Sequence, residues 1–127
     1  MLKVTEFAFT GYSVIDMGRA RAFYENVLNL KLGETFAEEG KEPTWVEYEI
    51  GPHTLAITIG GDMWKPSKDG GGVALEVEDF EGSLKWLKDK GVEPYFGPYE
   101  SPVCHMALIS DPDGNSICIH KRKPGHS

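Results

Sequence analysis

The sequence predicts an α+β fold made of two tandem βαβββ modules, and three observations support this prediction. Each half of the 127-residue chain opens with a strand-like segment that ends at an aspartate, Asp16 or Asp79. Each aspartate is followed by a segment with helical periodicity, and each helix is followed by further strand-like segments. The two aspartates lie about half a chain apart. A pattern repeated at that distance indicates a duplication within one domain, residues 1–127.

The first module begins with a strand and a helix. Residues 6–15 have alternating character and lead into Asp16, a residue type that commonly caps helix N-termini. Residues 17–30 then carry apolar side chains at helical spacing, so the predicted helix has one apolar face. These side chains are Ala20, Phe23, Val27 and Leu30.

A β-hairpin follows this helix. Residues 45–50 alternate strictly, a Gly-Pro-His turn comes next, and residues 54–59 run back as the partner strand. Residues 60–72 are rich in glycine and lysine and have no period, which predicts a linker. The linker divides module one, at about residues 4–60, from module two, at about residues 73–122. Met63 and Trp64 in the linker either cover a cavity or pack at a dimer contact.

The second module repeats the first. A strand at residues 72–78 ends at the capping Asp79, and a helix follows from Phe80 to a C-terminal Gly91. Leu84 and Leu87 share the side of this helix that carries Phe80. Further strands are predicted near residue 95, at 103–110 and at 116–121, and the turn DPDGN at residues 111–115 joins the last two.

The composition excludes several classes of protein. A net charge of −7 argues against a broad nucleic-acid surface, and no apolar run approaches the ~20 residues of a membrane span. The first residues lack the pattern of a signal peptide. The two cysteines, Cys104 and Cys118, indicate neither a disulfide framework nor a zinc site. We therefore expect a cytoplasmic protein that binds neither nucleic acid nor membrane.

Three segments carry a family resemblance: VIDMGRARAFYENVLNLKLGE, GGVALEVEDFEGSLKWLKDKGVE and ISDPDGNSICIH. They resemble the vicinal oxygen chelate superfamily, which includes glyoxalase I, fosfomycin-resistance enzymes, bleomycin-resistance proteins and extradiol dioxygenases. The resemblance implies a curved mixed sheet with the helices on its convex face. It also implies a ligand cavity on the concave side, enclosed by two modules from one chain or from a homodimer. We call the sheet face away from the helices the open face.

The resemblance places four metal-ligand positions on the open face, which metal-dependent members fill with His, Glu or Gln. In this sequence the four positions are Phe9, Ala56, Gly72 and Cys118. Three of these residues have no metal-binding side chain, and a lone thiolate is a poor site for a hard cation. We therefore expect neither a metal nor another cofactor, and no metal-dependent lyase or dioxygenase activity.

The predicted ligand-binding residues lie on the open face. Strand side chains alternate between the two faces, so the four positions above fix which residues share their face. The ligand-binding set combines aromatic residues, carboxylates and a histidine: Phe7, Phe9, Trp45, Glu47, Thr54, Ala56, Glu76, Cys104, Met106, Cys118 and His120. The opposite set is mostly aliphatic, as a core should be: Val46, Tyr48, Ile50, Leu55, Ile57, Ile59, Val73, Leu75, Val77, Ile117 and Ile119. Ordinary packing is the alternative for the aromatic residues, and a solvated sheet face is the alternative for the carboxylates.

The sequence also predicts the sheet faces on which His105 and the two cysteines lie. His105 falls on the helix side by strict alternation, unless a bulge near Pro102 reverses it. Cys104 and Cys118 share the open face, where buried apolar thiols are expected because no nearby cation would activate them.

Three functions remain open. The first is a metal-independent binding protein, similar to the bleomycin-resistance branch, which holds a cationic, aromatic-containing small molecule. The second is a glyoxalase-like lyase or isomerase in which His120, with Glu47 or Glu76, moves a proton on a bound carbonyl compound. His120 is the catalytic candidate because an unperturbed imidazole titrates near neutral pH. The third is a metalloenzyme that uses Glu47, Glu76 and His120 as unusual ligands. The acidic and aromatic character of the open face favours the first.

Overall fold

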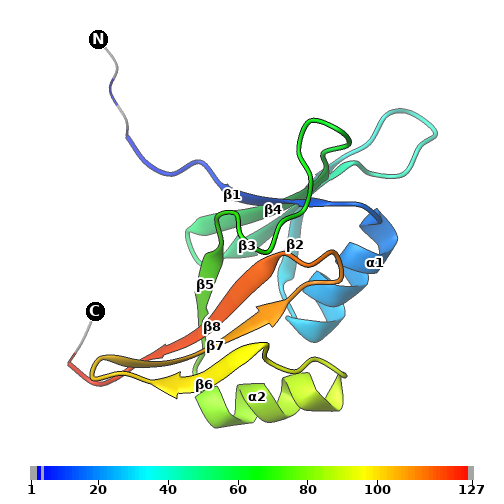
Figure 1. Cartoon of the computed structure of the whole chain (residues 1–127). Coiled ribbons are helices and arrows are strands. Elements are labelled where there is room, and N and C mark those ends of the chain that lie inside the picture. The colour runs from blue at the N-terminus through cyan, green and yellow to red at the C-terminus, as the bar shows by residue number, and fades with distance from the viewer. Residues whose placement is uncertain (1–2, 4, 126–127) are drawn as a thin grey trace. The chain divides into compact units, whose positions relative to one another are not determined.

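A computed structural model describes residue 3 and residues 5–125 of the chain, which divides into two compact units, Met1–Pro66 and Ser67–Ser127. The boundary falls inside the predicted linker. Each unit holds a four-stranded mixed sheet with a helix packed on it, and the elements follow one another in βαβββ order in both (Figure 1). The predicted fold class is therefore confirmed. Within residue 3 and residues 5–125, neither the length nor the hydropathy of any helix reaches that of a membrane span.

Unit 1 contains one helical segment and four strands. In the sheet the strand order is β1-β4-β3-β2, with β1 parallel to β4 and the other pairs antiparallel. The elements are β1 (Thr10–Val14), α1 (Met17–Ala22), a π-helical turn η1 (Phe23–Val27), β2 (Lys31–Phe36), β3 (Trp45–Ile50) and β4 (His53–Ile59).

Unit 2 repeats this arrangement. The strand order is β5-β8-β7-β6, with β5 parallel to β8 and the other pairs antiparallel. The elements are β5 (Val73–Glu76), α2 (Phe80–Asp89), β6 (Phe96–Glu100), β7 (Cys104–Ser110) and β8 (Ser116–Arg122). The duplication extends to the register, because Gly11 pairs with Ala56 in unit 1 and Ala74 pairs with Cys118 in unit 2.

The predicted helix caps are present. Asp16 Oδ1 accepts a hydrogen bond of 3.0 Å from the backbone N–H of Arg19, and Asp79 Oδ1 accepts one of 3.0 Å from that of Gly82. These bonds satisfy N–H groups that a helix leaves without intrahelical partners at its start. Both helices therefore begin where the sequence predicts.

The first helix ends earlier than predicted. Its last turn is a π-turn that stops at Val27, and Leu30 lies beyond it. Asn29 takes a left-handed backbone conformation with φ of 56°, which a helix interior does not allow but asparagine tolerates. The apolar period continues to Leu30, but the backbone turns away at Asn29.

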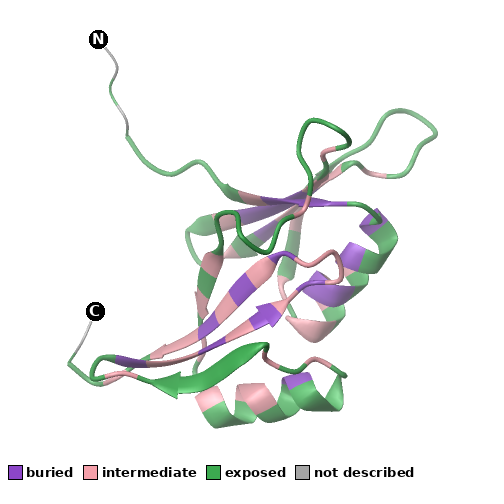
Figure 2. Ribbon diagram, viewed as in Figure 1, coloured by how far each residue is buried: buried purple, intermediate pink, exposed green. Residues whose placement is uncertain are grey.

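The core of each unit lies between its helix and its sheet, as the alternation predicts. Figure 2 shows buried and more exposed residues alternating along β7 and β8. The fully buried residues include most of the predicted aliphatic set: Val46, Tyr48, Leu55, Ile57, Ile117 and Ile119. Tyr24 of η1 stacks on Tyr48 with ring centroids 5.9 Å apart, which fixes the helix on the sheet. Ile59, at the end of β4, is 37% exposed and is an exception to the predicted core.

The DPDGN segment forms the turn between β7 and β8. Asp111 Oδ1 accepts hydrogen bonds of 2.9 Å from the backbone N–H groups of Asp113 and Asn115, and Asn115 Nδ2 donates to Asp111 Oδ2 at 2.8 Å. Asn115 Oδ1 also accepts a bond of 3.1 Å from Ser67 N. Asp111 and Asn115 are both buried. This turn therefore also anchors the start of unit 2.

Candidate functional site

The open face of unit 1 is built by β1, β4 and β3. Gly11, Ala56 and Glu47 lie in one row across these three strands. Trp45 stands two residues before Glu47 and therefore on the same face. The row has small residues on β1 and β4, and its one larger side chain, Glu47, lies on β3. The predicted face assignment of these residues agrees with this register.

Aromatic side chains gather beside this row. Phe9 meets Trp45 edge-to-face, with ring centroids 5.0 Å apart and planes at 90°. Trp64, from the segment after β4, places its Cη2 atom 3.1 Å from where a Cβ on Gly11 would stand. Phe9 and Trp64 therefore both lie against the side-chain-free surface of Gly11. We call Phe9, Trp45 and Trp64 the aromatic cluster.

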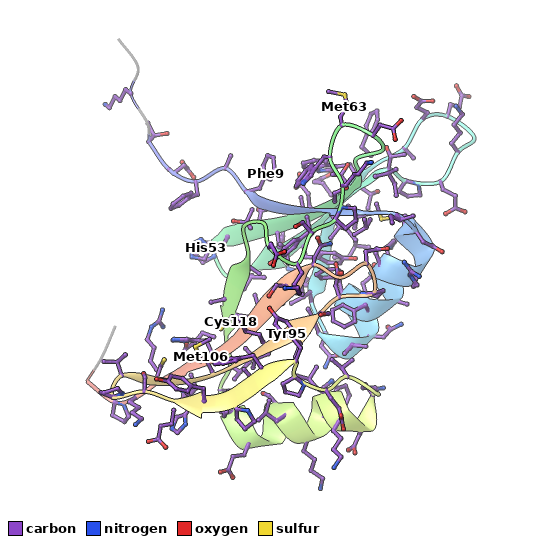
Figure 3. All side chains as sticks on the ribbon, viewed as in Figure 1. Phe9, His53, Met63, Tyr95, Met106 and Cys118 are labelled. Carbon is purple, nitrogen blue, oxygen red and sulfur yellow. The ribbon has the colours of Figure 1, made fainter. Side chains whose placement is uncertain are left out.

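The segment that carries Trp64 is held to β1 by its backbone. Ser13 Oγ, on the open side of β1, donates a hydrogen bond to the backbone carbonyl of Trp64. A Cβ at Gly60 would overlap this carbonyl and the Ser13 hydroxyl, so the close approach requires glycine. Met63 at the tip of the segment is fully exposed (Figure 3). Trp64 therefore lies over β1, and Met63 extends into solvent.

Glu47 has a neutral partner. Trp45 Nε1 donates to Glu47 Oε2 at 2.8 Å, and no Lys or Arg side chain among the described residues pairs with this carboxylate. Glu49, two residues further along the same face, is exposed and lies 3.5 Å from Lys31 Nζ. Glu47 is therefore the carboxylate of this face that keeps an uncompensated negative charge next to an aromatic ring.

The open face of unit 2 holds a different arrangement. Glu76 of β5, His120 of β8, Met106 of β7 and Tyr99 of β6 lie in one row across the sheet. Glu76 Oε1 lies 2.6 Å from His120 Nδ1, and Glu76 Oε2 accepts a bond of 2.8 Å from the backbone N–H of Arg122. The structure thus brings together two of the three predicted catalytic candidates.

The environment of Glu76 favours its charged form. The backbone N–H of Arg122 lowers the pKa of this carboxyl most, and the hydrogen bond with His120 lowers it further. Because Arg122 Nη1 also lies 4.0 Å from Glu76 Oε1, part of the negative charge is already balanced. A carboxylate that contacts one imidazole nitrogen holds the ring in one orientation and one tautomer.

The two cysteines lie on the open face of unit 2, as predicted, and both are free. Cys104 is buried, and its Sγ lies 3.3 Å from Ser101 Oγ. Burial raises the pKa of the Cys118 thiol, which keeps it protonated at neutral pH. Figure 3 places Cys118 and Met106 on the strands of unit 2. These surroundings match a packing role for both thiols better than a reactive one.

The remaining sequence predictions concern Phe7, Thr54 and His105. Phe7 precedes β1, which starts at Thr10, and is 92% exposed, so strand alternation does not fix its direction. Its role in ligand binding stays a prediction, as does that of Thr54 on β4. His105 lies on the helix side, where its ring meets Phe80 at 5.6 Å, so no bulge at Pro102 reverses it.

Sequence reasoning missed three exposed aromatic residues on the edge strands. Phe36 pairs with Trp45, Phe96 with Leu108 and Tyr99 with Met106, so all three share the open face of their unit. Two edge strands, β2 and β6, contain a register shift, between Leu32 and Thr35 and between Phe96 and Tyr99. Such shifts hide the alternation that marks a strand in a sequence.

The residues at the family's metal positions do not fit a metal ion. Phe9 packs against Trp45, Ala56 is buried, Gly72 has no side chain, and the Cys118 thiol stays protonated. Within the described residues, no three His, Cys, Asp or Glu side chains lie close enough together to hold an ion. The donor set of a metalloenzyme of this kind is therefore missing at these positions.

Comparisons with known proteins agree with this fold. TnmS3, an antibiotic binding protein from Streptomyces sp. CB03234, superposes with a TM-score of 0.79 at 21% identity, covering 97% of this chain and 100% of that chain. A putative glyoxalase family protein from Bacillus anthracis gives 0.77 at 20% identity, covering 97% and 99%. A superfamily member from Sphaerobacter thermophilus gives 0.76 at 23% identity, covering 94% and 99%.

These likenesses in structure establish the fold, and the family follows from the sequence. No curated protein matches the chain. The model of the Glyoxalase/Bleomycin resistance protein/Dioxygenase superfamily matches residues 6–119, which is most of the sequence. With two βαβββ units and the DPDGN hairpin in place, the chain belongs to the Glyoxalase/Bleomycin resistance protein/Dioxygenase superfamily.

Proposed function

We propose that this protein is a metal-independent binding protein for a small molecule that is cationic and contains an aromatic ring. The observation that carries the proposal is the pair formed by Trp45 and Glu47, whose Nε1 and Oε2 atoms lie 2.8 Å apart beside Phe9. The pair offers an aromatic ring and a negative charge on the same sheet face. Cations bind well over tryptophan rings, and aromatic side chains commonly line ligand sites.

The charges on the two units favour Glu47 as the partner of the cation. Glu76 lies 4.0 Å from the Arg122 guanidinium and accepts a bond from the Arg122 N–H, and Glu49 is paired with Lys31. Glu47 accepts from a neutral indole, which orients the carboxylate without cancelling its charge. A bound ammonium group could therefore make a charge-assisted hydrogen bond with Glu47 without displacing a Lys or Arg side chain from it.

Similarity to solved proteins supports the ligand class in general terms. TnmS3 is described as an antibiotic binding protein, and another neighbour from the same Streptomyces strain as a glyoxalase/bleomycin resistance protein. Sequence identities of 21% and 24% do not transfer a particular ligand. They agree with a role in which the fold holds a small organic molecule.

The test uses three compounds that share a naphthalene ring and carry a positive, a neutral and a negative group: 2-naphthylmethylammonium, 2-naphthylmethanol and 2-naphthoate. Binding is followed by tryptophan fluorescence and by titration calorimetry. We expect the ammonium compound to bind most tightly. Glu47→Gln should weaken it roughly tenfold to a hundredfold, the scale of one charged hydrogen bond.

Glu49→Gln is the matched control, because it removes the same charge from the same strand at a position already paired with Lys31. It should leave the affinity within about twofold of wild type. Preference for 2-naphthoate, or equal losses in the two variants, would contradict the proposal.

A second function is favoured by one specific contact, the 2.6 Å approach of Glu76 Oε1 to His120 Nδ1. In a metal-independent lyase or isomerase, Glu76 would orient the ring and His120 Nε2 would take a proton from a carbon next to a carbonyl group. The measurement is hydrogen–deuterium exchange at that carbon in hydroxyacetone, followed by NMR. Exchange catalysed by wild type and lost in His120→Gln would replace the binding role with this one.

We also propose that the protein is a homodimer, as the family resemblance implies, and that it lies in the cytoplasm, as its two cysteines without a disulfide framework suggest. Light scattering at micromolar concentration measures the mass directly. A strictly monomeric species would contradict the dimer without affecting the proposed ligand class.

A further inference from the structure

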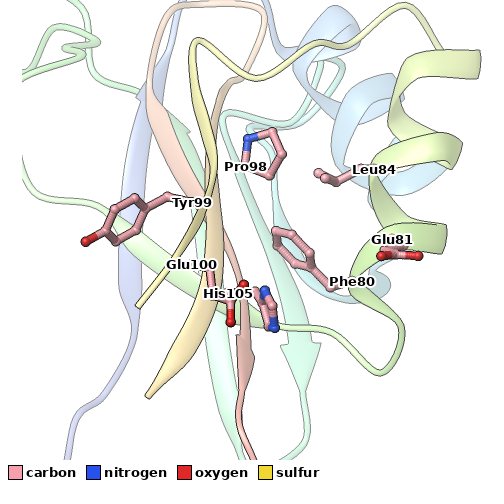
Figure 4. Close-up of a pocket in the computed structure, with 7 residues that line it drawn as sticks. All are labelled: Phe80, Glu81, Leu84, Pro98, Tyr99, Glu100 and His105. Carbon is pink, nitrogen blue, oxygen red and sulfur yellow. The ribbon is translucent and has the colours of Figure 1, made fainter. Parts of the chain in front are cut away.

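We propose that unit 2 carries a second small-molecule site, on the helix side of its sheet. Its ligand would be a small cation in which one aromatic ring carries an amidinium group. A cavity of about 360 Å³ lies between α2 and strands β6 and β7 (Figure 4). Its lining residues are Phe80, Glu81, Leu84, Pro98, Tyr99, Glu100 and His105. The volume is at the small end of the range for ligand pockets.

This cavity is separate from the open face. His105 lies on β7 between Cys104 and Met106, which belong to the open face, so alternation directs its side chain toward α2. The contact between the rings of Phe80 and His105, with centroids 5.6 Å apart, confirms that direction. The proposed second site therefore does not depend on the ligand of the open face.

A bulge in the edge strand forms one wall. Phe96 pairs with Leu108 and Tyr99 with Met106, so β6 has one more residue than β7 between these two pairs. Pro98 lies in this bulge and points toward Leu84 and Phe80 of α2, whereas the Tyr99 ring points to the other side of the strand (Figure 4). The bulge thus gives the cavity an apolar wall.

The polar groups of the lining select a hydrogen-bond donor. Glu81 and Glu100 are acceptors at neutral pH, and a neutral imidazole has one acceptor nitrogen. No other described residue makes a hydrogen bond with the His105 ring, which leaves both nitrogens available to a ligand. A ligand that offers only acceptors would find too few donors here.

The charges around the cavity favour a cation. Glu100 is paired with Lys123 Nζ, so its charge is largely compensated. Glu81, in the first turn of α2, makes no ion pair with any described residue. An amidinium on a benzene ring would place the ring against Phe80, Leu84 and Pro98. Its N–H groups would then reach His105 and the Glu81 carboxylate.

The experiment uses benzamidine as the probe, with benzamide and benzoate as matched neutral and anionic compounds, on the full chain. Methyl and imidazole NMR signals report the site directly. We expect millimolar benzamidine to shift the Leu84 methyl and His105 ring signals saturably and to leave the Met106 methyl signal of the open face unmoved. Benzamide should bind more weakly and benzoate should not bind.

Two variants test the assigned groups. His105→Phe keeps a ring against Phe80 and removes the acceptor, and Glu81→Gln removes an exposed charge without touching the core. Each should raise the Kd of benzamidine about tenfold or more, the scale of a charged hydrogen bond. Glu93→Gln, an exposed carboxylate outside the lining, is the control and should leave the Kd unchanged.

The proposal is overturned if benzamidine gives no saturable shift of Leu84, if benzoate binds equally well, or if the shifts appear at Met106 and persist in both variants. The last result would mean that the probe binds the open face of unit 2. It would leave the function proposed for the Trp45–Glu47 pair of unit 1 in place and remove only the second site.

Discussion

Glu76 and His120, on the neighbouring strands β5 and β8, hold their Oε1 and Nδ1 atoms 2.6 Å apart on the open face of unit 2. The contact joins two residues that are far apart in the sequence, and the backbone N–H of Arg122 completes it. These contacts hold the Glu76 carboxylate in a fixed position on this face.

The first prediction concerns the pH dependence of stability at Glu76. Its pKa is lowered from 4.5, first by the N–H of Arg122 and then by His120. A carboxyl whose pKa is lower in the folded state stabilises the fold above its unfolded pKa, and this contribution is lost as the pH falls through the folded value. Glu76→Gln should therefore be less stable than wild type at neutral pH.

The difference between the two proteins should shrink as the pH falls below 4.5. Urea unfolding across this range measures it. Glu78→Gln is the control, since Glu78 is an exposed neighbour on the same segment. A difference between wild type and Glu76→Gln that stays constant down to strongly acidic pH would contradict the assignment.

The second prediction concerns the close approach at Gly60. A Cβ there would overlap the Trp64 carbonyl and the Ser13 hydroxyl. Gly60→Ala should displace the Trp64 segment from β1 and destabilise the fold by about 1–3 kcal/mol, the usual cost of overpacking. Urea unfolding gives the free energy, and the tryptophan emission maximum should shift to the red.

Gly71→Ala is the matched control in the same linker, because a Cβ at Gly71 meets nothing within 4 Å. It should be neutral or slightly stabilising. If both alanine variants behave alike, the Ser13–Trp64 contact does not hold the segment in solution.

The third prediction concerns the hydrogen bond that ties the first helix to its sheet. The buried Tyr48 hydroxyl donates to Glu25 Oε2 at 2.9 Å, and Arg21 Nε donates to the same oxygen at 2.7 Å. Tyr48→Phe should cost about 1–2 kcal/mol of unfolding free energy, because Glu25 loses one donor but keeps Arg21. Tyr99→Phe, on an exposed residue, should cost nothing measurable in the same urea titration.

The fourth prediction concerns metal. If the protein works without an ion, dialysis against EDTA should change neither the melting temperature nor the affinity for 2-naphthylmethylammonium. Metal sites couple ion binding to folding, so a metal-dependent protein would lose stability and regain it with zinc, nickel or manganese. Such a loss and recovery would overturn metal independence.

Much of the fold follows from local rules in the sequence. Asp16 and Asp79 each stand directly before an amphipathic segment and cap the helix that it forms. The alternation in residues 45–50 separates the side chains that face the helix from those that do not. The duplication and the helix-facing core could therefore be predicted. The early end of the first helix could not, because the apolar period runs on to Leu30 although Asn29 turns the backbone.

The candidate sites likewise depend partly on local sequence pattern and partly on tertiary contacts. Strand alternation is a local property, and it places Trp45, Glu47, Glu76 and His120 on open faces. The partners of these side chains depend on the tertiary structure. Glu47 meets an indole and Glu76 meets an imidazole and an N–H group, because cross-strand register and side-chain rotamers select the contacts. The Trp64 segment over β1 and the cavity behind β6 likewise depend on close approaches between distant parts of the chain, which local pattern does not encode.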